Sequence, residues 1–366
     1  MVDKNLSNIN KINKKKVERI KLRKKKRRNR MIFTFVLSVL QIIIGFEILY
    51  LKDKSLKVEK YNSENSREVV ISIGGNCVLG NKSDDNEVKD IIADEERGYK
   101  YFLKDVQSIL SKDDFSIVNL ESPINRFKTD YKPSLSFEDY SNVMKDSSID
   151  GVVLSNFGDN KNKAVKVFEE NNISISNGED SYIKEINGVK IGIISYNGWG
   201  LTDDLKVKIA SNVENLNRQG VKFKIAYFNW GNREETEQNE VQEKVARFAI
   251  DNGVDAVIGN YPESIQGIEN YNGKLIAYSL GNLCYTGELN KNNTLSYILQ
   301  IKLNVNKEEL VNVEYKIIPV IISDTGSYIY KTSLADEKSK NSILKKLNKT
   351  ANDFKNEITE RYFEIK

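Results

Sequence analysis

The sequence predicts an α/β fold with mixed sheets, because short runs rich in β-branched residues alternate with helical patterns along the chain. Short apolar runs bounded by polar residues are typical of buried strands. The predicted strands cover residues 69–73, 116–119, 151–154, 190–195, 224–228 and 256–258. Helical patterns between them include residues 101–110, 163–170 and 237–251. Such alternation indicates parallel strands joined by crossover helices.

Two Asn-Gly pairs predict β-hairpins within this α/β pattern. Asn187-Gly188 and Asn272-Gly273 each lie between β-rich runs, and both residue types tolerate the positive φ that a tight hairpin turn requires. Further along, residues 294–304 and 310–322 have the pattern of a long antiparallel pair. Parallel units combined with hairpins predict that the sheets are mixed.

Residues 31–51, MIFTFVLSVLQIIIGFEILYL, predict a single transmembrane helix. A helix needs about 20 predominantly apolar residues to cross a bilayer. Glu47 interrupts the run near its outer end, where a carboxylate can reach the interface. The alternative is a cleaved signal peptide, which has a shorter apolar region and a small-residue cleavage site. The following segment, LYLKDKSLK, offers no such site, which favours an uncleaved membrane anchor.

The basic residues before this span predict its orientation. Residues 1–30 contain 14 Lys/Arg and two acids, so this tail is net +12, and a whole chain of +4 leaves −8 for the remainder. Positive charge beside a first span stays cytoplasmic, which puts the C-terminal domain outside the cell membrane. A nucleic-acid-binding tail is the alternative, but its position favours an orientation signal that also contacts anionic lipid. No nucleic-acid partner is expected.

The remaining 300-odd residues divide by composition into a stalk, a domain and a C-terminal segment. Residues 52–67 are polar and lack apolar periodicity, as in a stalk. Residues 68–330 contain the α/β pattern. In the segment 331–366, residues 338–362 are charged and helical in pattern, and we expect them to cap the domain.

Six segments, each placed where a predicted strand gives way to a loop, occur in a fixed order between residues 69 and 285. They are IGGNCVLG (73–80), VNLESPI (118–124), GVVLSNFG (151–158), NWG (229–231), VIGNYPE (257–263) and YSLGNL (278–283). In this order they resemble the motifs of the CapA family, the poly-γ-glutamate capsule synthesis proteins with a metallophosphatase-like fold. The resemblance implies a four-layer α/β/β/α sandwich, a detail that the periodicity alone does not supply.

The resemblance also implies a changed site, because a metallophosphatase-like site holds divalent metal between carboxylate, imidazole and amide ligands. This chain contains no histidine. The family's ligand positions are occupied by Asn76 for Asp, Phe157 and Gly158 for Asn-His, Asn229 for His, and Tyr261 and Glu263 for two His. We therefore expect neither a metal nor another cofactor in this chain.

The residues that match the family's cleft are expected to bind or to support, and none is predicted to be catalytic. They are Asn76, Asn119, Glu121, Asn156, Asn229, Trp230, Glu263 and Asn282. Each also has a structural interpretation: Asn119 and Glu121 can brace a loop through backbone hydrogen bonds, and Trp230 can pack in the core. Gly75, Gly231 and Gly281 are expected in tight turns.

Cys77 follows Gly-Gly-Asn (74–76) of the first segment, and Cys284 follows Leu-Gly-Asn-Leu (280–283) of the last. Since the resemblance places both motif loops beside one cleft, we expect the two cysteines to be neighbours. An extracellular setting permits a disulfide between them. Two buried free thiols are the alternative.

Three functions follow. The first is a non-catalytic, membrane-anchored extracellular protein for synthesis or export of a poly-γ-glutamate-like capsule or another envelope polymer. Its partners would be membrane lipid through residues 31–51, membrane-bound polymer synthase subunits and an anionic polymer. The second is a hydrolase of a polymer or phosphoester that uses Glu121 and Glu263, with Asp159 as a further candidate. The third is a generic extracellular binding module of the cell envelope.

Overall fold

The computed structural model describes residues 66–80, 86–121, 135–155, 161–178, 181–287, 293–307, 309–322, 330–351, 354 and 357–365, and the isolated positions 26, 41, 45 and 52. Ser66–Lys366 forms one compact unit and Met1–Asn65 another. The predicted tail (1–30) and span (31–51) lie outside the described residues except at isolated positions, as does most of the predicted stalk (52–67). None of the helices that the structure describes is long and apolar enough to cross a membrane.

The first sheet is mixed and has nine strands within the described residues. Its main order is β14-β13-β12-β1-β2-β3-β4, with β11 beside β1 and β15 beside β13. β1 is parallel to β2 and β11 and antiparallel to β12. The strands are β1 (Ser66–Val78), β2 (Phe115–Glu121), β3 (Gly151–Ser155), β4 (Ser174–Ser176), β11 (Asn282–Tyr285), β12 (Leu295–Asn306), β13 (Glu309–Ile322), β14 (Thr332–Leu334) and β15 (Phe363–Glu364).

The second sheet is also mixed, with the order β5-β6-β7-β8-β10-β9. Its strands are β5 (Tyr182–Ile186), β6 (Val189–Asn197), β7 (Phe223–Asn229), β8 (Ala256–Asn260), β9 (Ile268–Tyr271) and β10 (Lys274–Ala277). Both predicted hairpins are confirmed, β5–β6 and β9–β10. Their turn residues have positive φ, 51° and 74° at Asn187-Gly188 and 50° and 73° at Asn272-Gly273. Asn and Gly adopt this conformation at little steric cost.

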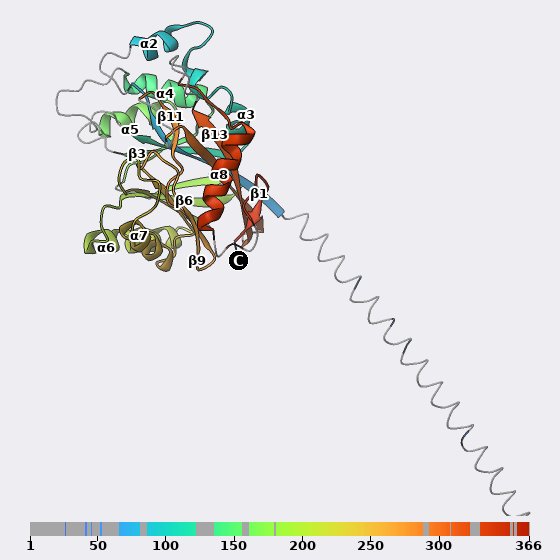
Figure 1. Cartoon of the computed structure of the whole chain (residues 1–366). Coiled ribbons are helices and arrows are strands. Elements are labelled where there is room, and N and C mark those ends of the chain that lie inside the picture. The colour runs from blue at the N-terminus through green and yellow to red at the C-terminus, as the bar shows by residue number, and fades with distance from the viewer. Residues whose placement is uncertain are drawn as a thin grey trace, which may run out of the picture. The chain divides into compact units, whose positions relative to one another are not determined.

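Helices cover the outer face of each sheet, so the layers follow the order α/β/β/α (Figure 1). Against the first sheet pack α2 (Asn86–Ala93), the 3₁₀ helix η1 (Tyr99–Leu103), α3 (Gln107–Leu110), α4 (Phe137–Asp146) and α5 (Lys161–Glu170). Against the second pack α6 (Asp203–Arg218) and α7 (Glu240–Asp251). This arrangement fits the metallophosphatase-like sandwich that the resemblance implied.

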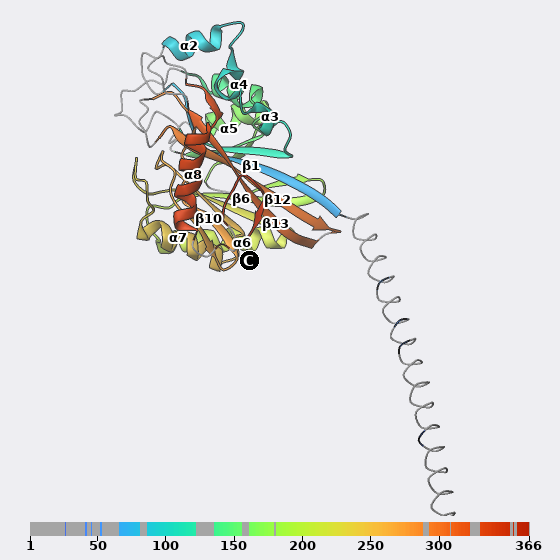
Figure 2. The same cartoon turned by 45° about the vertical axis from the view of Figure 1, so that its right-hand side comes forward.

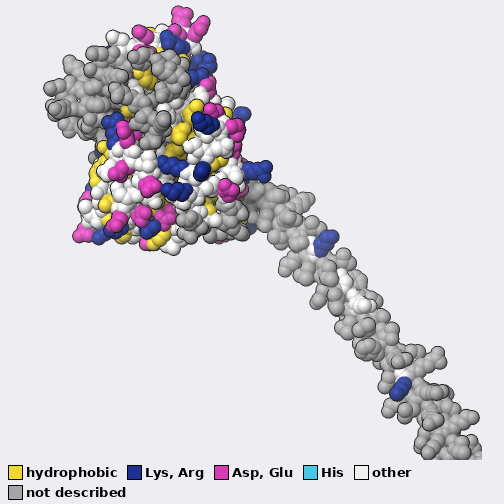
Figure 3. Space-filling view, viewed as in Figure 1, with side chains coloured by type: hydrophobic (Ala, Val, Ile, Leu, Met, Phe, Trp, Pro, Cys, Tyr) yellow, Lys and Arg dark blue, Asp and Glu magenta, His cyan; other side chains and the backbone are white. Residues whose placement is uncertain are grey.

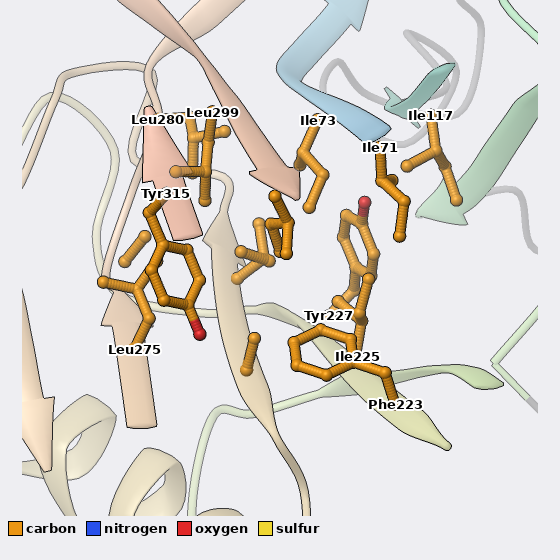
Figure 4. Packing of buried hydrophobic residues seen from close by; sticks show 14 of the residues in the cluster. Ile71, Ile73, Ile117, Phe223, Ile225, Tyr227, Leu275, Leu280, Leu299 and Tyr315 are labelled. Carbon is orange, nitrogen blue, oxygen red and sulfur yellow. The ribbon is translucent and has the colours of Figure 1, made fainter. Parts of the chain in front are cut away.

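The largest apolar core lies between the two sheets. Figure 4 shows Ile71 and Ile73 of β1 facing Ile225 and Tyr227 of β7, and all four side chains are buried. Full burial of one such side chain stabilises the fold by roughly 1.5–3 kcal/mol. The two sheets are therefore held face to face, and residues at the edge of this core keep fixed positions.

The C-terminal segment closes one side of the sandwich. Asp336 caps the N-terminus of helix α8 (Glu337–Thr350), because its side chain accepts a hydrogen bond from the Ser339 backbone N–H at 2.7 Å. The helix contacts β12 and β13 of the first sheet and β9 of the second (Figure 2). The sequence pattern predicted a helical segment over residues 338–362, which is too long. Helix α8 ends at Thr350, and the chain then returns to form β15, which pairs with β13.

Candidate functional site

The alternation of side chains along four strands places a group of polar residues at one edge of the inter-sheet core. Alternate residues of a strand share a face. In each strand the inward residues are apolar along its length and polar at its carboxyl end. The successions are Ile117 to Asn119 and Glu121 in β2, Val153 to Ser155 in β3, Tyr227 to Asn229 in β7, and Ile258 to Asn260 in β8.

A chain of amide hydrogen bonds joins the strand ends of the first sheet. In the register of the sheet, Asn76 of β1 lies opposite Asn119 of β2 and Asn282 of β11. Asn119 Nδ2 donates to Asn76 Oδ1 at 2.8 Å, and Asn76 Nδ2 donates to Asn282 Oδ1 at 3.3 Å. Ser155 Oγ donates to Asn119 Oδ1 at 2.6 Å. All four side chains are uncharged and buried, so the network is neutral and shielded from water.

The second sheet joins this network through the residue that follows β8. The backbone N–H of Tyr261 donates to Asn76 Oδ1 at 3.2 Å. Tyr261 has φ of 94°, and Glu263 two residues later has φ of 64°, values that are uncommon outside glycine. Strained backbone of this kind clusters at functional sites. The loop after β8 is therefore held in an unfavourable conformation directly against Asn76.

Two further asparagines end β7 and β8 in direct register, Asn229 opposite Asn260. Both side chains are buried, at 4% and 2% exposure. Neither amide oxygen nor amide nitrogen of either residue has a hydrogen-bond partner among the described residues. Leaving such groups unsatisfied costs about 1–3 kcal/mol each, and native proteins rarely keep them without reason. These amides can serve a polar ligand. We name Asn76, Asn119, Ser155, Asn229, Asn260 and Asn282 together the strand-end site.

An ion pair borders the strand-end site. The Glu263 side chain is fully buried, and its Oε1 accepts a hydrogen bond from Arg233 Nε at 2.8 Å. Arg233 Nη2 also donates to the Tyr285 hydroxyl at 3.1 Å. Arg233 follows β7, Glu263 follows β8 and Tyr285 is the last residue of β11. The contacts of Arg233 therefore connect the loops after β7 and β8 with the end of β11.

Trp230 packs in the core, which is the structural interpretation of this motif residue. Its Nε1 donates to the Tyr278 carbonyl at 2.9 Å, and its ring stacks on Phe228 with centroids 4.9 Å apart. Trp199 is the tryptophan that reaches solvent, at 50% exposure, and it makes an edge contact with the Tyr261 ring. An exposed aromatic surface therefore lies beside the loop after β8.

Cys77 and Cys284 are register partners on the parallel strands β1 and β11. Both are buried free thiols, which is the second of the two alternatives that the sequence left open. Burial raises the pKa of Cys77 to about 12 and also raises that of Cys284. Neither thiol is activated as a nucleophile, because the thiolate is the reactive form.

The structure brings most of the predicted cleft residues to one place. Asn76, Asn119 and Asn282 bond to one another, and Glu121 is buried two residues beyond Asn119 on the same strand face. Asn156 lies outside the described residues, as do Phe157, Gly158 and Asp159.

Three contributors were missed by the sequence analysis: Ser155, Asn260 and Arg233. Continuing the alternation past Val153 and Ile258 would have found the first two. The sequence contains no signal for Arg233, since its role depends on how the loops after β7 and β8 fold.

Residues 71–286 match the model of a family described as bacterial capsule synthesis protein PGA_cap, a span of more than half of the chain. The chain belongs to this family. Among curated relatives, capsule biosynthesis protein CapA of Bacillus anthracis is 21% identical over 363 residues, which cover 90% of this chain and 84% of that protein. PGA biosynthesis protein CapA of Bacillus subtilis (strain 168) is 39% identical over 56 residues, 15% of each chain.

A solved structure also resembles this PGA_cap member. It is the crystal structure of a hypothetical protein from Thermus thermophilus, with a TM-score of 0.42 and 11% identity, covering 69% of this chain and 99% of that chain. The family match and the curated relatives together indicate a capsule-related function.

Proposed function

We propose that this PGA_cap-family protein acts in capsule biosynthesis as a non-catalytic binding component, anchored in the membrane with its folded domain outside the cell. One observation carries the non-catalytic part: Asn76 Oδ1 accepts hydrogen bonds from both Asn119 Nδ2 and the Tyr261 N–H. Asn76 stands where the family has a carboxylate. Its acceptor oxygen is engaged in joining the two sheets.

The donors around Asn76 do not fit the divalent metal that the resemblance implies for the family. Asn119, Asn229 and Asn282 are neutral amides, and Glu263 is paired with Arg233. Among the described residues, no three His, Cys, Asp or Glu side chains are grouped to hold a metal ion. A divalent ion needs anionic or imidazole ligands to offset its dehydration. The side chains of this site therefore do not fit a divalent metal ion.

The hydrolase alternative requires two carboxylates that work as acid and base. Glu263 suits neither role as placed, because its Oε1 is engaged by the Arg233 guanidinium at 2.8 Å. Glu121 is buried at the end of β2, and Asp159 lies outside the described residues. The geometry therefore favours binding over hydrolysis.

Binding chemistry is supplied by Asn229 and Asn260. Their buried amides offer both donors and acceptors without a charge, which suits an amide or hydroxyl group of an envelope polymer. The exposed Trp199 beside Tyr261 adds an aromatic surface against which a polymer can lie. The polymer would reach the domain from membrane-bound synthase subunits.

Complementation of a strain that lacks the gene tests this function. Asn229→Leu removes the amide at nearly constant volume, and we expect it to lower cell-associated capsule polymer severalfold while stabilising the isolated fold by about 1 kcal/mol. Glu121→Gln should restore capsule to the wild-type level, as should the exposed control Glu240→Gln. Loss of capsule with E121Q at normal protein level would support the hydrolase instead.

The topology has its own experiment. Protease added to intact, wall-stripped cells should degrade the domain and leave a short N-terminal fragment that carries the basic tail. A domain that is fully protected until the cells are lysed would reverse the proposed orientation.

A further inference from the structure

A hollow lies between α8 and the segment that precedes α7. Its volume is about 390 Å³. None of its residues belongs to the strand-end site. Its lining consists of Thr236, Glu237, Gln238, Gly267, Ser342, Lys345, Lys346, Lys349 and Thr350.

Helix α8 presents its lining residues on one face. Positions 342, 345, 346, 349 and 350 follow the spacing i, i+3, i+4, i+7 and i+8, so they lie side by side along one face of the helix. The adjacent face is fixed, because Ile343 and Leu347 are fully buried in the inter-sheet core. Figure 3 shows Lys and Arg side chains gathered over α8 on this side of the domain. The lysines therefore project from a rigid support.

Positive charge is in excess within this hollow. Its three lysines face a single carboxylate, Glu237, whose Oε1 lies 3.4 Å from Lys349 Nζ in a mostly exposed pair. Lys345 and Lys346 form no ion pair with a described residue. Burial lowers the pKa of Lys346 and the charge of Lys349 acts in the same direction, while Glu237 opposes both. An anion placed here would relieve the repulsion between the ammonium groups.

We propose that this hollow is a binding site for an acidic chain, in which Lys345, Lys346 and Lys349 pair with successive carboxylates. The lysine stems and Gly267 supply the apolar lining for the chain's aliphatic part. Thr236, Gln238 and Ser342 are polar neighbours for its remaining groups. The C-terminal dipole of α8 opposes an anion with about half a charge, which three ammonium groups outweigh.

The size of the hollow favours a chain over a small anion. Pockets of roughly 300–1,000 Å³ hold ligands of several linked groups, and a single phosphate would fill only part of this one. The proposal does not depend on whether the strand-end site is catalytic.

Binding of a defined probe to the detergent-solubilised full chain tests the site. We would titrate hexaglutamate into the wild type, Lys346→Gln and the control Lys338→Gln. Lys338 is exposed on the same helix and does not line the hollow. The basic N-terminal tail also attracts the probe, but it is identical in all three proteins. We expect K346Q to weaken binding by about threefold or more and K338Q by less than about 1.5-fold. Equal effects of the two variants would overturn the proposal.

Two further probes and a footprint complete the experiment. Hexaglutamine should not compete, and pyrophosphate should compete only weakly. If pyrophosphate binds as well and is equally sensitive to K346Q, the site is a phosphate site and the proposal is wrong. Acetylation of wild-type lysines, read by mass spectrometry, requires no variant to fold. Hexaglutamate should protect Lys345, Lys346 and Lys349 more than Lys338, and uniform protection would contradict the site.

Discussion

Arg233 Nε lies 2.8 Å from Glu263 Oε1, and this contact joins a half-exposed guanidinium to a completely buried carboxylate. Glu263 adopts φ of 64°. Arg233 follows β7 and Glu263 follows β8, so the ion pair is a structural contact between the loops after these two strands.

Removing the Arg233 guanidinium from this ion pair should destabilise the fold. Arg233→Gln is expected to lower the free energy of unfolding by about 2–3 kcal/mol, because it leaves the buried Glu263 carboxylate without its guanidinium partner. Chemical denaturation measures the change. Glu240→Gln, which breaks the exposed Lys244–Glu240 pair, is the control and should cost less than about 0.5 kcal/mol. Similar costs for R233Q and E240Q would show that the buried pair contributes little.

Gly259 is required by the close approach of Trp230 and Tyr278. A Cβ there would lie 1.9 Å from the Tyr278 carbonyl oxygen and 2.4 Å from Trp230 Nε1. Gly259→Ala should therefore destabilise the fold by about 3 kcal/mol and break the Trp230–Tyr278 hydrogen bond. Gly200→Ala, where a Cβ meets nothing within 4 Å, should change stability little. In a Trp199→Phe background Trp230 is the sole tryptophan, and its fluorescence should move to longer wavelength in G259A but not in G200A.

Asp113 gives the fold a pH dependence of definite sign. Burial raises the pKa of its carboxyl to about 6, and hydrogen bonds from Ser72 and Ser116 oppose the shift. The folded state binds this proton more tightly than the unfolded state, whose pKa is about 4. Stability from Asp113 is therefore complete below pH 4 and is lost as pH rises through about 6.

Asp113→Asn should remove that loss. Relative to the wild type, D113N should gain about 1 kcal/mol between pH 4 and pH 7, a figure reduced for solvent screening. Unfolding at several pH values measures the difference. Glu309→Gln, at an exposed carboxylate, should show no such gain. A wild type whose stability rises through this pH range relative to D113N would contradict the assignment.

The two thiols should be inert until the protein unfolds. Burial raises the pKa of both Cys77 and Cys284, so thiolate is scarce and shielded at neutral pH. A disulfide-exchange reagent should release no colour from the native protein and titrate two thiols per chain in concentrated guanidinium. If the denatured chain shows thiols only after a reductant is added, the cysteines are bonded and the free-thiol assignment is wrong.

Sequence patterns predicted the strands better than the helices. All six predicted strands are confirmed, since buried apolar runs leave few alternatives. Residues 101–110 were expected as one helix, but the structure forms η1 and α3, with an i+3 hydrogen bond from the Val106 N–H to the Leu103 carbonyl between them. Helix α6 was not among the predicted helices, although Thr202 caps it and its buried residues Leu205 and Ile209 are four apart.

Glycine roles were predicted in part. Gly231 and Gly281 have φ of 72° and 81°, as tight turns require. Gly75 does not have positive φ. It is needed because a Cβ there would lie 2.0 Å from the Gly281 carbonyl oxygen, a contact between residues far apart in sequence. Close approaches of this kind depend on tertiary packing and leave no local signal.

The site was predictable where it follows strand alternation and unpredictable where it depends on contacts between distant loops. Asn76 and Asn282 are 206 positions apart, and only the motif resemblance placed them together. The engagement of Asn76 Oδ1 by Tyr261 depends on the unusual φ of that tyrosine, which no residue pattern encodes.

Metal content of the purified full chain tests the central claim most directly. After dialysis against metal-free buffer, mass spectrometry should find manganese, iron and zinc far below one ion per chain, because Asn76 is engaged by Asn119 and Asn282 and the strand-end amides supply no negative charge. The same preparation should hydrolyse a generic phosphoester no faster when these metals are added. About one ion per chain, lost on Glu121→Ala or Glu263→Ala, would contradict the binding role and support a hydrolase.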